Sequence, residues 1–214
     1  MTETKKLIMS NVDIFQHLVN VHLNNSNRGY FNQFYERVQF KLEAAKYFLE
    51  RLEKLERTAG NLASASRSEV ELNLDAFLYE VVGALDPLLQ EINIALGLGS
   101  KLKEVNMSNI ISKLPKDSHL RNTLVTADRD TQGWFWRLRE YRNHSAHRKI
   151  IGFNIFIGGT EDGDVYLHED PLDIKKGRAK EKVIPYCQNS AKRMEYLIDE
   201  IYGLCATELS SSKP

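Results

Sequence analysis

Residues 142–147 bring an arginine, an amide and two histidines together within about one and a half helical turns. The segment reads Arg142, Asn143, His144, Ser145, Ala146 and His147. An arginine fork can hold a phosphate through two parallel hydrogen bonds. A histidine with an ordinary pKa of about 6.5 can accept and release a proton near neutral pH. This combination is typical of chemistry on a phosphate group, and no other segment of the sequence concentrates reactive side chains so densely.

Metal-free cleavage of RNA requires three functions that these residues can supply. The 2′-hydroxyl must lose its proton, the charge on the phosphorane must be neutralised, and the leaving oxygen must gain a proton. His147 is the candidate for proton transfer, and Arg142 is the candidate for stabilising the transition-state charge. Asn143, four residues before His147, is placed to orient it. Such a reaction would leave products that end in a 2′,3′-cyclic phosphate.

Helical geometry sets a condition on this pair. Residues five positions apart on a regular α-helix point about 140° away from each other. Arg142 and His147 therefore meet one phosphate in one of three ways. The helix loosens before His147, the arginine side chain bends around the helix, or the working pair comes from two chains.

Composition limits the partners of the protein. The chain has 29 basic and 29 acidic residues among 214, with a formal net charge of zero. This argues against a protein that coats nucleic acid through net charge. Basic residues nevertheless cluster around the segment, with Glu140 as the only acidic residue in that run; they are Arg137, Arg139, Arg142, Arg148 and Lys149.

Periodic apolar residues predict the helices that carry the segment. Steps of three and four between apolar positions indicate amphipathic helices. They are expected at residues 31–57, 69–96, 108–113, 117–128, 131–147 and 185–209. Pro87 should kink the second helix or split it in two, and Gly97 should end it. Residues 12–23 are ambiguous, residues 24–29 are expected to be a polar break, and residues 60–66 a linker.

The pattern after the segment changes to one typical of strands. Two β-prone runs, residues 150–157 and 165–168, flank a glycine-rich acidic turn and predict a β-hairpin. Residues 171–182 are polar and are expected to form a loop. Within residues 131–147, Trp134, Leu138 and Tyr141 are expected to face the core, with Trp136 off that stripe.

The fold expected from these elements is all-α, an antiparallel helical bundle with a β-hairpin insertion before the last helix. We expect one domain over residues 1–214. Residues 1–30 would form an N-terminal extension, and residues 149–182 would form the insertion.

The motif resembles the signature of the HEPN superfamily, an arginine followed after four to six residues by a histidine, with a polar residue such as Asn143 after the arginine. The resemblance implies a HEPN-like bundle and a metal-independent endoribonuclease of single-stranded RNA. It also implies a homodimer whose two motifs meet in a cleft. On this template Arg142 and His147 carry the reaction and Asn143 supports it. Many such proteins act in toxin–antitoxin, antiviral or RNA-processing systems, which suggests an antitoxin or a nucleotidyltransferase as a partner.

Further residues were assigned from the neighbourhood of the motif. His144, Arg139 and Arg148 are candidates for contacts with the RNA, although His144 can equally be a plain surface residue. Asp75 and Glu80 of the second helix are candidates to reach the cleft, with exposure at the surface as the alternative, and the sequence does not choose between them.

Three other readings remain open. The chain can be a non-catalytic HEPN-like module that binds a partner protein or a nucleotide. It can also be a structural or sensor module that assembles through the hairpin and Trp136. Finally, Arg142 and His147 can form only caps and ion pairs near a helix end, where cations are favoured.

No cofactor or metal is expected, because no histidine or cysteine pattern has the spacing of a metal site. Cys187 and Cys205 are expected to be buried and reduced. The absence of an apolar run long enough to span a bilayer predicts no membrane association and a cytoplasmic protein.

Overall fold

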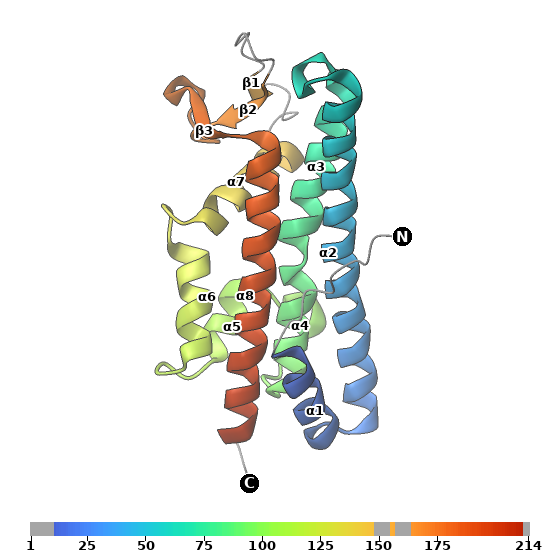
Figure 1. Cartoon of the computed structure of the whole chain (residues 1–214). Coiled ribbons are helices and arrows are strands. Elements are labelled where there is room, and N and C mark those ends of the chain that lie inside the picture. The colour runs from blue at the N-terminus through green and yellow to red at the C-terminus, as the bar shows by residue number, and fades with distance from the viewer. Residues whose placement is uncertain (1–10, 148–154, 157–163, 212–214) are drawn as a thin grey trace. The chain divides into compact units, whose positions relative to one another are not determined.

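The structure is a computed structural model that describes residues 11–147, 155–156 and 164–211, with the backbone alone for residues 144–147, 155, 156 and 174. Most of these residues are helical, and short strands gather before the last helix (Figure 1). The α-helices are α1 (Val12–His22), α2 (Asn25–Ala59), α3 (Arg67–Gly83), α4 (Leu85–Ala95), α5 (Met107–Lys113), α6 (His119–Arg129), α7 (Trp134–His147) and α8 (Val183–Ser211). The strands are β1 (Ile155–Phe156), β2 (Tyr166–His168) and β3 (Arg178–Lys182). The predicted helical fold with an antiparallel β insertion before the last helix is confirmed.

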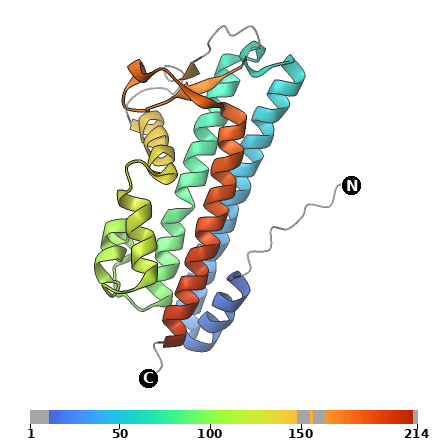
Figure 2. The same cartoon turned by 60° about the vertical axis from the view of Figure 1, so that its left-hand side comes forward.

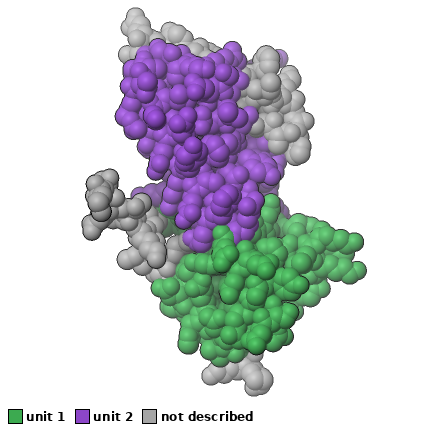
Figure 3. All heavy atoms as spheres, turned by 90° about the vertical axis from the view of Figure 1, so that its right-hand side faces the viewer, with its two compact units in different colours: residues 1–36, 86–125, 194–214 green, residues 37–85, 126–193 purple. Residues whose placement is uncertain are grey.

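The chain divides into two compact units, shown in different colours in Figure 3. Unit 1 contains residues 1–36, 86–125 and 194–214, and unit 2 contains residues 37–85 and 126–193. The helices α2 and α8 contribute residues to both units. The 142–147 segment and the strands belong to unit 2.

Pro87 explains why the predicted helix at residues 69–96 is two helices. The helix α3 ends at Gly83, and Ala84 follows it as a cap. A proline at position 87 has no N–H to donate to the carbonyl of residue 83, and its ring would clash with that carbonyl. Pro87 instead lies in the first turn of α4, where helices tolerate proline. The split that the sequence predicted is therefore confirmed, and Gly97, with a φ of 60°, follows the end of α4.

The chain breaks between α1 and α2 at Leu23 and Asn24, but the predicted break at residues 24–29 is too long, because residues 25–29 are already helical. The side chain of Asn24 accepts a hydrogen bond from the backbone N–H of Asn27 at 2.9 Å, and its carbonyl accepts one from Arg28 at 2.9 Å. An asparagine in this position satisfies a donor that the first turn of a helix leaves unpaired. The helix consequently starts at Asn25 rather than at residue 31.

The β insertion contains a third strand where the sequence predicted a loop. β2 pairs with β1 on one side and with β3 on the other, both antiparallel. β3 has the sequence Arg-Ala-Lys-Glu-Lys, which lacks the apolar alternation of a half-buried strand. Charged side chains on an edge strand discourage further pairing, which accounts for this composition. Figures 1 and 2 both show the strands next to α7 and the beginning of α8.

Unit 1 includes α1, the segment that was ambiguous in the sequence. Asn11, just before α1, donates its backbone N–H to Asp199 Oδ1 at 3.0 Å and its amide to Asp199 Oδ2 at 3.1 Å. A Cβ at Gly203 would lie 2.9 Å from the Asn11 side chain, so α8 needs a glycine at this contact. The Phe15 ring then packs against Phe31 and Tyr202, with ring centroids 5.5 and 5.4 Å away.

A carboxylic acid lies in the core of unit 1. Glu91 of α4 is fully buried, and the Tyr202 hydroxyl donates a hydrogen bond to its Oε1 at 3.3 Å. Its Oε2 has no hydrogen-bond partner among the residues that the structure describes. Burial raises the pKa of Glu91 well above its usual value, and the bond from Tyr202 opposes this only in part.

We expect Glu91→Gln to stabilise the protein above neutral pH by about 1–3 kcal/mol, the cost of one poorly satisfied buried polar group. Because the pKa is raised on folding, the folded state holds the proton more tightly. The stability that this provides is complete below the unfolded pKa and is lost as the pH rises through the folded pKa. The gain from glutamine should therefore shrink as the pH falls. Urea unfolding at pH 4.5, 6 and 8 measures it, with the exposed Glu43→Gln as control; a gain that is the same at all three pH values would contradict the prediction.

The two cysteines match expectation. Cys187 and Cys205 are both free and buried, and burial raises the pKa of each thiol. Such thiols are poor nucleophiles, because the reactive thiolate is disfavoured.

Among the described residues, no helix is both long and apolar enough to cross a bilayer.

Candidate functional site

The helix α7 carries the 142–147 segment, and a tight turn sets its start. Gly133 N–H donates to the carbonyl of Asp130 at 2.9 Å, and Gln132 N–H donates to the Asp130 carboxylate at 3.1 Å. A Cβ at position 133 would lie 2.9 Å from that carboxylate and 3.0 Å from that carbonyl. A glycine is thus required where α7 begins.

The buried face of α7 differs from the predicted one. Phe135, Leu138 and Tyr141 are buried, and α7 packs against α3. Trp134, expected in the core, is only half-buried and lines a pocket instead. The true stripe starts one residue later. Its i, i+3, i+6 spacing spreads over about 120° of the helix, wider than the roughly 60° of the i, i+4, i+7 spacing used for Trp134, and still forms one apolar face. The prediction for Leu138 and Tyr141 is confirmed.

Two side chains anchor α7 on either side of its middle. Arg139 donates to the Asp128 carboxylate at 2.7 Å and to the Asp128 carbonyl at 3.0 Å, which ties α7 to the end of α6. The buried Tyr141 hydroxyl donates to the backbone carbonyl of His168 in β2. Arg142 follows directly after this second anchor, so two fixed contacts lie within the three residues that precede it.

The two neighbouring arginines differ in how their charges are used. Arg139 is neutralised by its ion pair with Asp128. Arg142 is half-buried, and its Nε is shielded from solvent without a hydrogen-bond partner in the described part of the chain. A buried guanidinium N–H normally has a partner, because leaving it unsatisfied costs free energy. Among the described residues, Arg142 thus has an unpaired N–H, whereas the charge of Arg139 is neutralised.

The other predicted site residues are placed as follows. Asn143 is half-buried and donates its amide to Glu140 at 3.3 Å. Arg139, predicted to contact RNA, is the residue bound to Asp128, and a phosphate would have to compete with that carboxylate. The side chains of His144 and His147, and Arg148 as a whole, lie outside the described residues.

The backbone of α7 excludes one of the three ways of bringing Arg142 and His147 together. The helix continues through His147, so it does not loosen before that residue. Positions 142 and 147 are consequently about 140° apart around the axis. For these two residues to act on one phosphate, either the arginine must bend around the helix or a second chain must complete the pair.

The two polar residues of α3 that the sequence left open lie in different surroundings. Glu80 forms an ion pair with Lys41 of α2 at 2.8 Å, and the Lys41 ammonium lies 4.5 Å from the centre of the Tyr79 ring. Glu80 thus joins α2 to α3. Asp75 is half-buried on the same helix.

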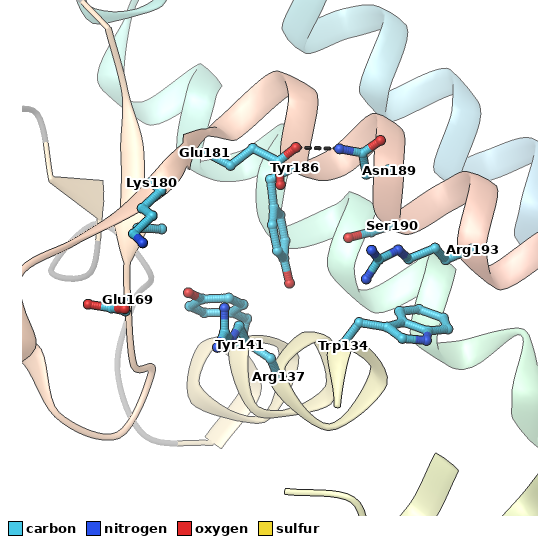
Figure 4. A pocket seen from close by; sticks show the side chains of 11 residues that line it. Trp134, Arg137, Tyr141, Glu169, Lys180, Glu181, Tyr186, Asn189, Ser190 and Arg193 are labelled. Atoms are coloured by element: carbon cyan, nitrogen blue, oxygen red, sulfur yellow. Dashed lines mark hydrogen bonds between the residues drawn. The ribbon is translucent and has the colours of Figure 1, made fainter. Parts of the chain in front are cut away.

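A pocket that the sequence did not predict lies between α7, β3 and the first turns of α8, all within unit 2 (Figure 4). It has a cavity volume of about 340 Å³. Its polar and aromatic lining includes Trp134, Arg137, Tyr141, Glu169, Lys180, Glu181, Tyr186, Asn189, Ser190 and Arg193. These residues are spread between positions 134 and 193, so no local motif could have predicted the pocket. The sequence analysis named three of them for other reasons: Arg137 in the basic cluster, and Trp134 and Tyr141 as expected core residues.

No group of three or more histidine, cysteine, aspartate or glutamate side chains is arranged to hold a metal ion within the described ranges.

Comparisons of the chain with protein-family models, with curated protein sequences and with solved structures find no match. The assignment of a function therefore depends on the chemistry of the residues themselves.

Proposed function

We propose that this protein is a HEPN-type endoribonuclease that cleaves single-stranded RNA without a metal ion and works as a homodimer. The observation that carries the proposal is Arg142. It has a shielded Nε with no partner among described residues, beside an arginine that is neutralised. It lies five positions before a histidine on a helix anchored at Asp128 and at His168.

The proposed reaction is an attack of the 2′-oxygen on the adjacent phosphorus. The 2′-hydroxyl loses its proton to a base, the new P–O bond forms, and the bond from phosphorus to the 5′-oxygen breaks. The leaving oxygen gains a proton. His147 exchanges these protons and Arg142 stabilises the charge on the phosphorane. The products are a 2′,3′-cyclic phosphate and a 5′-hydroxyl, with no oxidant, metal or cofactor consumed.

Helix geometry supports the proposed homodimer. Because α7 is helical through His147, Arg142 and His147 of one chain occupy different sides of that helix. In a twofold dimer, Arg142 of one protomer can face His147 of the other, and symmetry then creates two such sites. An antitoxin or a nucleotidyltransferase remains the proposed further partner, and defence against foreign nucleic acid the proposed context.

The purified protein should cleave an unstructured RNA in the presence of excess EDTA at the same rate as without it. A metal-independent reaction requires no divalent ion, and the 2′-oxygen mechanism requires cyclic-phosphate ends. Gel analysis of a labelled RNA, with mass spectrometry of the products, measures both. A 2′-deoxy substitution at the cleaved position is the control and should block the reaction. Loss of activity on chelation, or products with 5′-phosphates, would contradict the proposed mechanism.

A second candidate function is a non-catalytic HEPN-like module that binds a partner protein or a nucleotide. The formal net charge of zero favours it, because surfaces that bind RNA are usually more basic. The same cleavage assay decides between the two, since this module would bind RNA or a nucleotide and leave the RNA intact.

A further inference from the structure

We propose that the pocket between α7, β3 and α8 binds one nucleotide unit, with its phosphate held by Arg137 and Arg193 and its base against Trp134. The pocket uses neither Arg142 nor His147. The inference therefore goes beyond the proposed cleavage activity and does not depend on it.

The charges of the pocket favour an anion. Arg137, Lys180 and Arg193 are its cations, and none of them has a side-chain hydrogen bond or ion pair to another residue in the described part of the structure. Glu169 and Glu181 are its carboxylates, and Glu181 accepts a hydrogen bond from the Asn189 amide. Both arginines are exposed at their side of the pocket, where a guanidinium fork can take a phosphate through two hydrogen bonds.

A buried hydroxyl inside the pocket needs a polar partner. Figure 4 shows the Tyr186 side chain pointing into the pocket from α8. Its hydroxyl is shielded from solvent and makes no hydrogen bond of standard geometry with a described residue. Burial raises the pKa of Tyr186 well above its usual value, and the neighbouring Ser190 lowers it only in part, so the phenol is neutral and can donate. An oxygen of a ligand would relieve the cost of this unsatisfied group.

The hydroxyl of the neighbouring Tyr141 cannot donate a hydrogen bond to the same ligand. The Tyr141 ring meets the Tyr186 ring edge-on, with centroids 5.6 Å apart. The Tyr141 hydroxyl, however, already donates to the carbonyl of His168. Tyr141 therefore supports the Tyr186 ring, and the Tyr186 hydroxyl is the donor that lacks a standard hydrogen bond.

The aromatic wall and the size of the pocket specify the rest of the ligand. Figure 4 shows Trp134 on the same side as Arg193, with Lys180 and Glu169 on the other side. The Trp134 ring meets the buried Phe135 ring at 73° with centroids 5.7 Å apart, which holds the indole in place. A planar base can stack on such a ring. A cavity of about 340 Å³ is at the small end for ligand sites, so it suits one nucleotide rather than a longer segment.

Two kinds of ligand would fit such a pocket: a free nucleoside monophosphate, and a single nucleotide within an RNA strand. Both present a phosphate beside a planar base, and the test distinguishes them by its probes. The probes are 5′-adenosine monophosphate, adenosine, inorganic phosphate and a 2′-O-methyl pentanucleotide, which has no 2′-hydroxyl and cannot be cleaved by the proposed reaction.

The test is a titration of the Trp136→Phe protein, in which Trp134 is the only indole because the chain has two tryptophans. We expect the monophosphate to quench the fluorescence with saturation, and to bind at least about tenfold more tightly than adenosine or phosphate alone. Isothermal calorimetry on the wild-type protein repeats the measurement in case the Trp136 variant folds poorly. Tighter binding of the pentanucleotide would identify the strand as the source, and binding of the monophosphate alone would identify the free nucleotide.

Substitutions in the pocket complete the test. Arg137→Ala combined with Arg193→Ala should weaken binding of the preferred probe by at least about tenfold, and Tyr186→Phe should weaken it by a smaller factor. The exposed Arg129→Ala, outside the pocket lining, is the matched control and should bind as the wild type does. The proposal is overturned if no phosphate-bearing probe saturates, or if saturable binding survives the double substitution. Failure of RNA cleavage would leave these binding results unchanged, so the two proposals are tested separately.

Discussion

Arg142→Ala and His147→Ala should each lower the rate of RNA cleavage by about 100-fold or more, the usual contribution of a single charge-stabilising or proton-transferring group. Arg142 Nε has no hydrogen-bond partner among the described residues, and in the proposed mechanism the loss of its charge removes the stabilisation of the phosphorane. Loss of His147 would leave the 2′-hydroxyl without its base. The measurement is the initial rate of cleavage of a labelled RNA under single-turnover conditions.

The controls for this prediction match each residue type. Arg129→Ala removes an exposed arginine at the end of α6, and His119→Ala removes an exposed histidine at its start. Both should keep wild-type rates. Thermal unfolding of all four variants checks that the fold is intact. If a folded Arg142→Ala or His147→Ala protein cleaves at the wild-type rate, the proposed mechanism is wrong, and these residues are parts of the helix end alone.

Mixing inactive Arg142→Ala and His147→Ala proteins should restore cleavage. If each site combines Arg142 of one protomer with His147 of the other, a mixed dimer has one intact site and one doubly damaged site. With free exchange of subunits in a twofold dimer, half of the dimers are mixed, and about a quarter of the wild-type activity should return. The experiment requires incubation of the two variants at equal concentration before the RNA is added.

This prediction separates the two arrangements that α7 leaves open. Because the helix is continuous through His147, the pair forms between chains or by the arginine bending around its own helix. In the second case neither protomer of a mixed dimer has both groups, and mixing restores nothing. Each variant incubated with itself is the control. Absence of recovery, together with mixed dimers detected by a size tag on one variant, would show that the pair is within one chain.

The helices were predictable because their apolar spacing reports directly which face is buried. Residues 185–209 were expected to be helical, and α8 covers them with two further residues at each end. Pro87 similarly predicted the division between α3 and α4, because its missing N–H acts locally. The start of α2 was not predicted, since Asn24 can either break a helix or cap one, and only the hydrogen bond to Asn27 decides between them.

Features that depend on residues far apart in the sequence could not be predicted from it. β3 is a strand because β2 lies beside it, and its own charged sequence contains no sign of that partner. The nucleotide pocket was missed for the same reason. Trp134 and Arg193 lie on different helices, and Tyr186 gave no signal in the sequence that its hydroxyl would lack a standard hydrogen bond. The 142–147 segment, by contrast, was recognisable because its chemistry is contiguous.

The hydrogen bond from the Tyr141 hydroxyl to the main-chain carbonyl of residue 168 depends on the residue type at only one of its two ends. Every amino acid offers a carbonyl oxygen, so substitution at position 168 leaves the acceptor in place. The donor, in contrast, exists only while residue 141 carries a hydroxyl long enough to reach. This one hydrogen bond therefore constrains the residue type at position 141 and not at position 168, and position 141 is one residue before the arginine on which the proposed catalysis depends.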